Sequence, residues 1–84
     1  MQDAKAQHAR STIRRLTEMV VGQKGIVVSL AQDKPGMRKK LMALGILPGT
    51  PVRLLQRFPS YLIQAGRSQV VIDTELAMEI WVKT

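Results

Sequence analysis

The sequence contains no cysteine, and this absence excludes disulfide bridges, thiolate metal sites and thiol nucleophiles. Histidine occurs once, as His8, so a catalytic triad has a single candidate base, which lies in the N-terminal segment. Acidic residues are also few. Asp73 and Glu75 are close in sequence, but capping of a short helix explains them without acid–base chemistry. We therefore expect a protein that is not an enzyme and that needs no cofactor.

Metal ligands are equally sparse. Transition-metal sites need several imidazoles, thiolates or carboxylates that converge on one point. His8 with the nearby Asp3 is a weak candidate pair, and a solvated histidine is the simpler interpretation. The five methionines mostly fall within apolar patterns, where thioethers commonly fill gaps in a core. We expect no metal site within one copy of the chain.

Long hydrophobic runs are missing too. The apolar stretches 26–28 and 70–72 are far shorter than the ~20 residues that a membrane-spanning helix requires. Residues 1–15 are polar and charged and lack the apolar central segment of a secretory signal. These features predict a cytoplasmic protein that does not insert into a membrane.

What the chain has in excess is positive charge, because 13 Lys and Arg face 6 Asp and Glu and the formal net charge is +7. Such a balance favours an anionic partner: nucleic acid, a phospholipid surface or an acidic protein. Proteins that bind single-stranded nucleic acid usually interleave several aromatic residues with basic ones, so that bases can stack. Only Phe58, Tyr61 and Trp81 are aromatic here, which makes nucleic acid the less favoured partner.

The chain divides into an N-terminal basic arm, residues 1–15, and one compact domain, residues 16–84. The arm has weak apolar periodicity, and we expect it to be disordered or partly helical. Five β-rich segments separated by turn residues predict five short strands, near residues 25–30, 52–57, 61–65, 69–72 and 80–82. We therefore predict a mostly β fold, a small barrel that leaves no exposed sheet edge.

One short helix interrupts these strands. Met37, Leu41 and Leu44 recur at the spacing of one helical face, and Gly45 is suited to the left-handed conformation that ends a helix. Counted from that glycine, Ile46 should fold back onto Leu41. The predicted domain is thus a five-stranded barrel with one inserted helix.

The opposite side of this helix carries Arg38, Lys39 and Lys40. The simpler interpretation of such a cluster is the solvated face of an amphipathic helix. The functional interpretation is an electropositive docking face for an acidic partner. Arg53 and Arg57 alternate outward on the next predicted strand, where they either extend this face or are isolated strand charges.

The segment 41–52, with the sequence LMALGILPGTPV, resembles the signature of the FeoA family, in which a basic helix ends at Leu-Gly and a Pro-Gly turn leads into a strand. The paired-glycine turn at 22–25 and the closing segment 75–82 are similar to the family pattern as well. The resemblance covers roughly residues 16–83. The chain departs from many relatives in a shorter turn near residues 58–60.

The resemblance implies an SH3-like barrel and an accessory role in bacterial ferrous iron uptake. Family members are thought to bind the cytoplasmic G-domain region of the FeoB membrane transporter, and transition-metal binding is attributed to the family. The same module also occurs at the C-terminus of metal-dependent repressors, where it makes protein contacts.

The partner-binding residues that we predict lie on the basic helix, on the loop that follows it and on the next strand: Arg38, Lys39, Lys40, Gly45, Ile46, Leu47, Pro48, Gly49, Arg53 and Arg57. Two other functions are compatible with the sequence. One is a small basic barrel that binds nucleic acid. The other is a structural module that forms a homodimer through its last strand, near Trp81.

Overall fold

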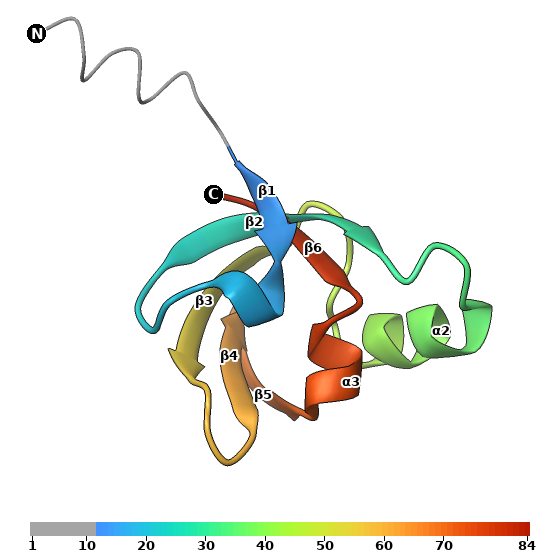
Figure 1. Cartoon of the computed structure of the whole chain (residues 1–84). Coiled ribbons are helices and arrows are strands. Elements are labelled where there is room, and N and C mark those ends of the chain that lie inside the picture. Colours follow the sequence, from blue (N-terminus) through green and yellow to red (C-terminus); the bar gives the residue numbers. More distant parts are fainter. Residues whose placement is uncertain (1–11) are drawn as a thin grey trace, which may run out of the picture.

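Six strands account for much of residues 12–84, the part of the chain that the computed structural model describes (Figure 1). They form one antiparallel sheet in the order β1-β6-β2-β3-β4-β5. The strands are β1 (Ile13–Arg15), β2 (Lys24–Leu30), β3 (Pro51–Gln56), β4 (Tyr61–Ala65), β5 (Ser68–Ile72) and β6 (Ile80–Lys83). Three helical segments connect them: the 3-10 helix η1 (Leu16–Glu18), α2 (Pro35–Ala43) and α3 (Thr74–Ala77).

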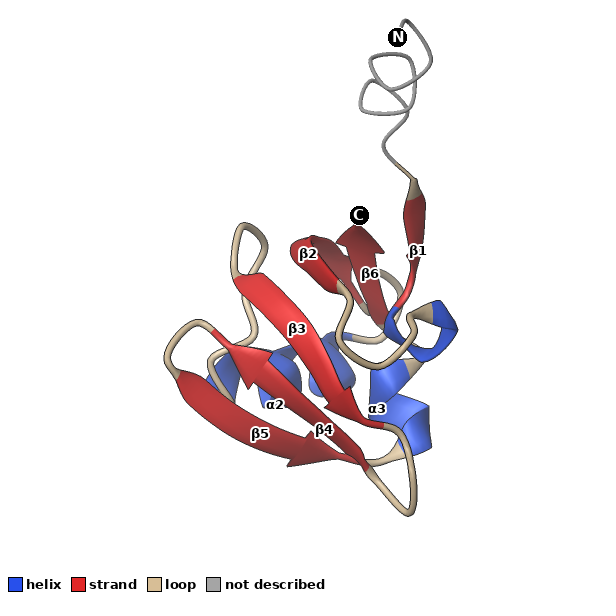
Figure 2. Ribbon diagram, turned by 90° about the vertical axis from the view of Figure 1, so that its left-hand side faces the viewer, coloured by secondary structure: helices blue, strands red, loops and turns tan. Residues whose placement is uncertain are grey.

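The strands follow from side chains that alternate between the two faces of the sheet. In β4, Tyr61, Ile63 and Ala65 are buried, whereas the residues between them are only half-buried. Successive residues of a strand point to opposite faces, so this pattern defines an inner and an outer face. The pairing register shifts in β2 between Val27 and Ser29, and such irregularities bend a strand and increase its twist. The sheet therefore curls around its own inner face (Figure 2).

That inner face forms a single apolar core, to which η1, α2 and α3 also contribute. Its largest fully buried side chains are Leu16, Met19, Leu41, Ile46, Leu54, Ile63, Ile80, Val27 and Val82. Within residues 12–84 no polar or charged residue is buried. The core is therefore a scaffold, and the described charged side chains are left at the surface.

The prediction of a mostly β fold with an inserted helix is confirmed, with one strand more than expected. Ile13–Arg15 forms β1, which pairs with β6 so that Ile13 lies opposite Lys83 and Arg15 opposite Trp81. This strand has no apolar alternation, and it forms because the backbone of β6 offers unpaired groups along that side. The predicted arm of residues 1–15 therefore includes three residues, Ile13–Arg15, that belong to the sheet. Its residues 1–11 lie outside the described part of the chain.

Helix α2 ends as the sequence predicts. Gly45 adopts a φ of 89°, and the Ile46 amide donates a hydrogen bond of 3.0 Å to the Leu41 carbonyl. Leu41 and Ile46 are both fully buried. The rest of the expected apolar stripe is less buried, since Met37 is half-buried and Leu44 is exposed. Among residues 12–84 no helix has the length and apolar character needed to cross a membrane.

Candidate partner-binding surface

The structure divides the predicted binding residues between two places. The helix residues and the loop after them lie on one side of the molecule, and Arg53 and Arg57 lie on or just after β3. Figure 1 shows α2 at the right of the molecule and β3, a strand of the sheet, at the left. Arg53 and Arg57 therefore do not extend the basic face of α2, contrary to one of our two interpretations.

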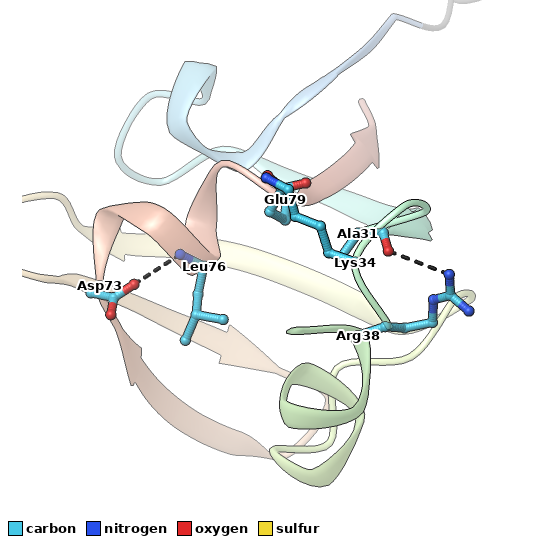
Figure 3. Close-up of polar contacts among 6 residues, drawn as sticks. All are labelled: Ala31, Lys34, Arg38, Asp73, Leu76 and Glu79. Carbon is cyan, nitrogen blue, oxygen red and sulfur yellow. Dashed lines mark hydrogen bonds and ion pairs between the residues drawn. The ribbon is translucent and has the colours of Figure 1, made fainter. Parts of the chain in front are cut away.

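Arg38 is occupied by its own loop. Its Nη2 donates a hydrogen bond to the carbonyl oxygen of Ala31, at 3.3 Å (Figure 3). It also donates to the carbonyl oxygen of Gln32, at 2.7 Å. These bonds attach the body of α2 to the segment that precedes it. Arg38 thus holds the loop before α2 in place, and its guanidinium is engaged within the protein. The proposed contact surface therefore does not include Arg38.

The start of α2 is attached by an ion pair. Lys34 Nζ lies 2.7 Å from Glu79 Oε2, which joins the residue before α2 to the residue before β6 (Figure 3). The hydrogen bond and the charge of Glu79 raise the pKa of Lys34 above its ordinary value. Nearby, the Asp73 carboxylate accepts a hydrogen bond of 2.8 Å from the Leu76 amide, which confirms the predicted capping role of Asp73. These carboxylates have structural partners.

Lys39 and Lys40 remain free, because neither forms an ion pair or side-chain hydrogen bond within the described residues. Met42 follows Lys39 by one helical turn, and Leu44 follows Lys40 by one turn, so each lysine lies beside an apolar side chain. Met42 is 44% exposed and Leu44 is 39% exposed. Leu47, in the loop, is 41% exposed. Pro48, next to Leu47 in the loop, is exposed as well. We call this group of six residues the helix-end surface: Lys39, Lys40, Met42, Leu44, Leu47 and Pro48.

The loop after α2 is held rigidly against the sheet. The Leu47 amide donates to Thr50 Oγ1, at 3.1 Å, and the Thr50 amide donates back to the Leu47 carbonyl, at 2.9 Å. Gly49 has a φ of 94° and donates to the Val27 carbonyl of β2 at 2.7 Å. The predicted turn at Pro48 and Gly49 is therefore anchored to the core. Ile46, by contrast, is a core residue and not a contact residue, because its burial is complete.

Arg57, like Arg38, forms hydrogen bonds to backbone carbonyls of its own chain. Its Nη1 donates to the Thr17 carbonyl at 3.0 Å and also to the Met19 carbonyl, and its guanidinium lies 5.7 Å from the centre of the Tyr61 ring. It therefore fastens the end of β3 to the segment around η1. Arg53 is exposed and lies opposite Lys24 of β2. Arg57 is removed from the predicted contact residues, and Arg53 belongs to a different face.

The sequence prediction included Leu47 and Pro48 of the helix-end surface but missed two exposed apolar residues, Met42 and Leu44. Met42 is one of the methionines whose apolar surroundings predicted a core position, yet it is 44% exposed, because on a helix it points away from the adjacent Leu41. Adjacent residues of an α-helix point about 100° apart, and this offset was the signal in the sequence that Met42 does not share the buried face of Leu41. In residues 12–84 no group of three or more His, Cys, Asp or Glu side chains is arranged to hold a metal ion. The weak candidates Asp3 and His8 lie outside the described residues.

The comparisons with known proteins agree with this architecture. The family model of the FeoA domain matches residues 14–84. A crystal structure of an iron uptake regulatory protein, FeoA, is 32% identical and superposes with a TM-score of 0.75, covering 87% of this chain and 99% of that chain. No curated protein matches the chain.

Two further structures share the fold. The FeoA protein of Stenotrophomonas maltophilia, complexed with zinc and described as a prokaryotic SH3 domain protein, is 21% identical with a TM-score of 0.70, covering 82% of this chain and 88% of that chain. A manganese-dependent transcriptional repressor is 24% identical with a TM-score of 0.79, covering 87% of this chain. The chain spans only 42% of that repressor's length.

Proposed function

Because the chain belongs to the FeoA family, which has an SH3-like fold and is associated with ferrous iron transport, we propose that it is a non-enzymatic accessory protein of bacterial ferrous iron uptake. It acts in the cytoplasm by binding the G-domain region of an FeoB-type transporter. The helix-end surface is the contact site. The observation that carries this proposal is the exposure of three apolar side chains at the end of α2 and in the anchored loop after it. They lie beside Lys39 and Lys40, which have no partner within residues 12–84.

The charge of the helix-end surface accounts for the first step of binding. Lys39 and Lys40 attract an acidic patch of the partner and raise the association rate, as complementary charges at an interface do. Such attraction is screened by salt, with a Debye length of about 10 Å at 0.1 M ionic strength. We therefore expect association that weakens as the salt concentration rises.

The apolar side chains stabilise the complex once the partner has docked. Met42, Leu44 and Leu47 lose contact with water when a partner covers them, and burial of apolar surface stabilises a complex by about 25 cal/mol per Å² before the costs of association. The hydrogen bonds of the loop keep Leu47 and Pro48 in place before the partner arrives. Little conformational entropy is then lost on binding.

The proposal is tested by calorimetric titration of the purified cytoplasmic G-domain of FeoB from the same organism. Lys40→Glu should weaken binding about fivefold, equivalent to roughly 1 kcal/mol, because it removes one rim charge and introduces a repulsive one. Leu47→Ser should weaken binding without changing its salt dependence. Arg67→Glu is the matched control, since Arg67 is exposed in the β4–β5 turn and undergoes the same change of charge.

The three variants together distinguish a local contact site from an effect of net charge. Unchanged affinity for both Lys40→Glu and Leu47→Ser would overturn the assignment of the helix-end surface. An equal loss for Lys40→Glu and Arg67→Glu would show that only net charge matters, which also contradicts a local contact site.

A further inference from the structure

The outer face of the sheet carries a second group of cations, where β6, β2 and β3 lie side by side. The register places Lys24 of β2 directly opposite Arg53 of β3, and Lys83 of β6 directly opposite Ile26 of β2. Residues that lie opposite each other in an antiparallel pair point to the same side of the sheet. The three cations therefore share one face, although the first and the last are 59 positions apart in the sequence.

The Lys24–Arg53 pair is unfavourable in the free protein. Like charges directly opposite each other on neighbouring strands destabilise a sheet. Neither side chain has a carboxylate partner, because the one ion pair within residues 12–84 joins Lys34 to Glu79. An anionic group bound between Lys24 and Arg53 would relieve this repulsion.

The surface between the cations is hollowed and partly apolar. Two shallow hollows meet at Gly25 and Pro51, one extending toward Lys83 and the other toward Arg53. Ile26 lines the first hollow with its side chain 49% exposed, and Pro51 lies directly opposite it. Among the described residues, no aspartate or glutamate lines either hollow. We call this area the basic sheet face, and it comprises Lys24, Ile26, Pro51, Arg53 and Lys83.

We propose that the basic sheet face is a docking site for an extended, acidic segment of a partner protein. The carboxylates of such a segment neutralise the three cations, and one apolar side chain covers Ile26 and Pro51. In an extended chain alternate side chains lie about 6.8 Å apart on one side. That spacing matches the separations of roughly 5 to 8 Å between opposite and diagonal positions on a sheet.

Other occupants fit this face less well. Residues 1–11 carry Lys5 and Arg10 against one acid, Asp3, so this part of the chain has the wrong sign of charge. Single-stranded nucleic acid needs exposed aromatic rings for stacking. Trp81 is half-buried, and the Arg15 guanidinium lies 4.7 Å from the centre of its ring. The combination of cations with an aliphatic floor favours a peptide.

The test is a titration of the ¹⁵N-labelled full chain, followed by NMR, with an N-acetylated and C-amidated octapeptide of seven glutamates around one central leucine. Amide shifts are expected at Lys24, Ile26, Arg53 and Lys83. The double variant Lys24→Glu with Arg53→Glu should bind at least tenfold more weakly. The matched control, Lys39→Glu with Lys40→Glu, has the same net charge and should weaken binding much less, because it lowers only the long-range attraction and leaves the basic sheet face intact.

Several outcomes would overturn the proposal. Equal weakening in the two double variants, or shifts centred on α2, would mean that the peptide responds to net charge or to the helix-end surface. Tighter binding of an oligothymidylate to the same residues would indicate nucleic acid as the occupant. A dimer in sedimentation velocity that Lys24→Glu with Arg53→Glu abolishes would show that a second copy covers the face.

The test remains decisive if the double variant is poorly folded, because Lys83→Glu removes a cation of the same face and should also weaken peptide binding. The result is independent of the proposed function. Binding of the transporter domain depends on Lys40 and Leu47, whereas peptide binding depends on Lys24, Arg53 and Lys83.

Discussion

Gly25 lies where β2 passes so close to β6 that a side chain does not fit. A Cβ atom at this position would lie 2.4 Å from Cγ1 of Val82 and 2.9 Å from the carbonyl oxygen of Lys83. Gly36, near the start of α2, has the opposite environment, since its Cβ would meet no atom within 4 Å. The two glycines thus provide a direct comparison of crowded and open backbone.

Gly25→Ala should lower the free energy of unfolding by about 1 to 3 kcal/mol, because the added methyl group forces the buried Val82 and the backbone of β6 to move. Gly36→Ala should instead raise it by about 0.5 to 1 kcal/mol, since alanine favours the helical conformation more than glycine does. Urea denaturation followed by circular dichroism measures both changes. If Gly25→Ala and Gly36→Ala had the same free energy of unfolding, the close approach of β2 and β6 would be contradicted.

At the scale of elements, α2 is only weakly embedded in the fold. Leu41 is its only buried residue, and the remaining attachments are the Lys34–Glu79 pair, the Arg38 hydrogen bonds and the contact with Ile46. An element with so little buried surface is positioned by few interactions. The helix-end surface therefore depends on Leu41 for its geometry.

Leu41→Ala should lower the free energy of unfolding by about 2 to 5 kcal/mol, the range for a leucine removed from a packed core. Leu44→Ala serves as its control, because Leu44 is exposed and its truncation should change stability by less than about 1 kcal/mol. Chemical denaturation gives both values. If the two truncations cost the same, α2 does not rest on the core through Leu41.

The whole molecule is a small apolar core surrounded by an excess of positive charge. Three of its five described aspartates and glutamates have structural partners away from the basic sheet face: Glu18 accepts the Arg15 amide, Asp73 caps α3 and Glu79 pairs with Lys34. With a net charge of +7, many of the basic side chains repel one another without a neighbouring acid to offset the repulsion. Such self-repulsion opposes the compact state and is weakened by salt.

Raising the sodium chloride concentration from about 20 to about 300 mM should accordingly raise the free energy of unfolding, since the Debye length shortens from roughly 20 Å to roughly 6 Å. The rise should be smaller for Lys24→Glu with Arg53→Glu, whose net charge falls by four, from +7 to +3. Urea denaturation at each salt concentration measures the effect. A fall in stability of the original chain with salt would show that attractive pairs dominate its electrostatics.

Local patterns in the sequence determined the features that depend on neighbouring residues. The spacing of Leu41, Gly45 and Ile46 predicted how α2 ends, because a helix cap is formed by residues only a few positions apart. The β-rich segment 61–65 predicted a strand, and β4 (Tyr61–Ala65) confirms it. The signature in residues 41–52 indicated the FeoA family, which the match over residues 14–84 confirms.

The tertiary structure alone decided which side chains are free and which are neighbours. Arg57 looked like a surface cation, yet its bonds to Thr17 and Met19 join positions some 40 residues apart. Strand β1 exists because β6 offers an unpaired edge, which no pattern within residues 13–15 encodes. The basic sheet face likewise arises from register between distant strands. Periodicity determines the face on which a side chain lies, but the path of the chain determines what lies opposite it.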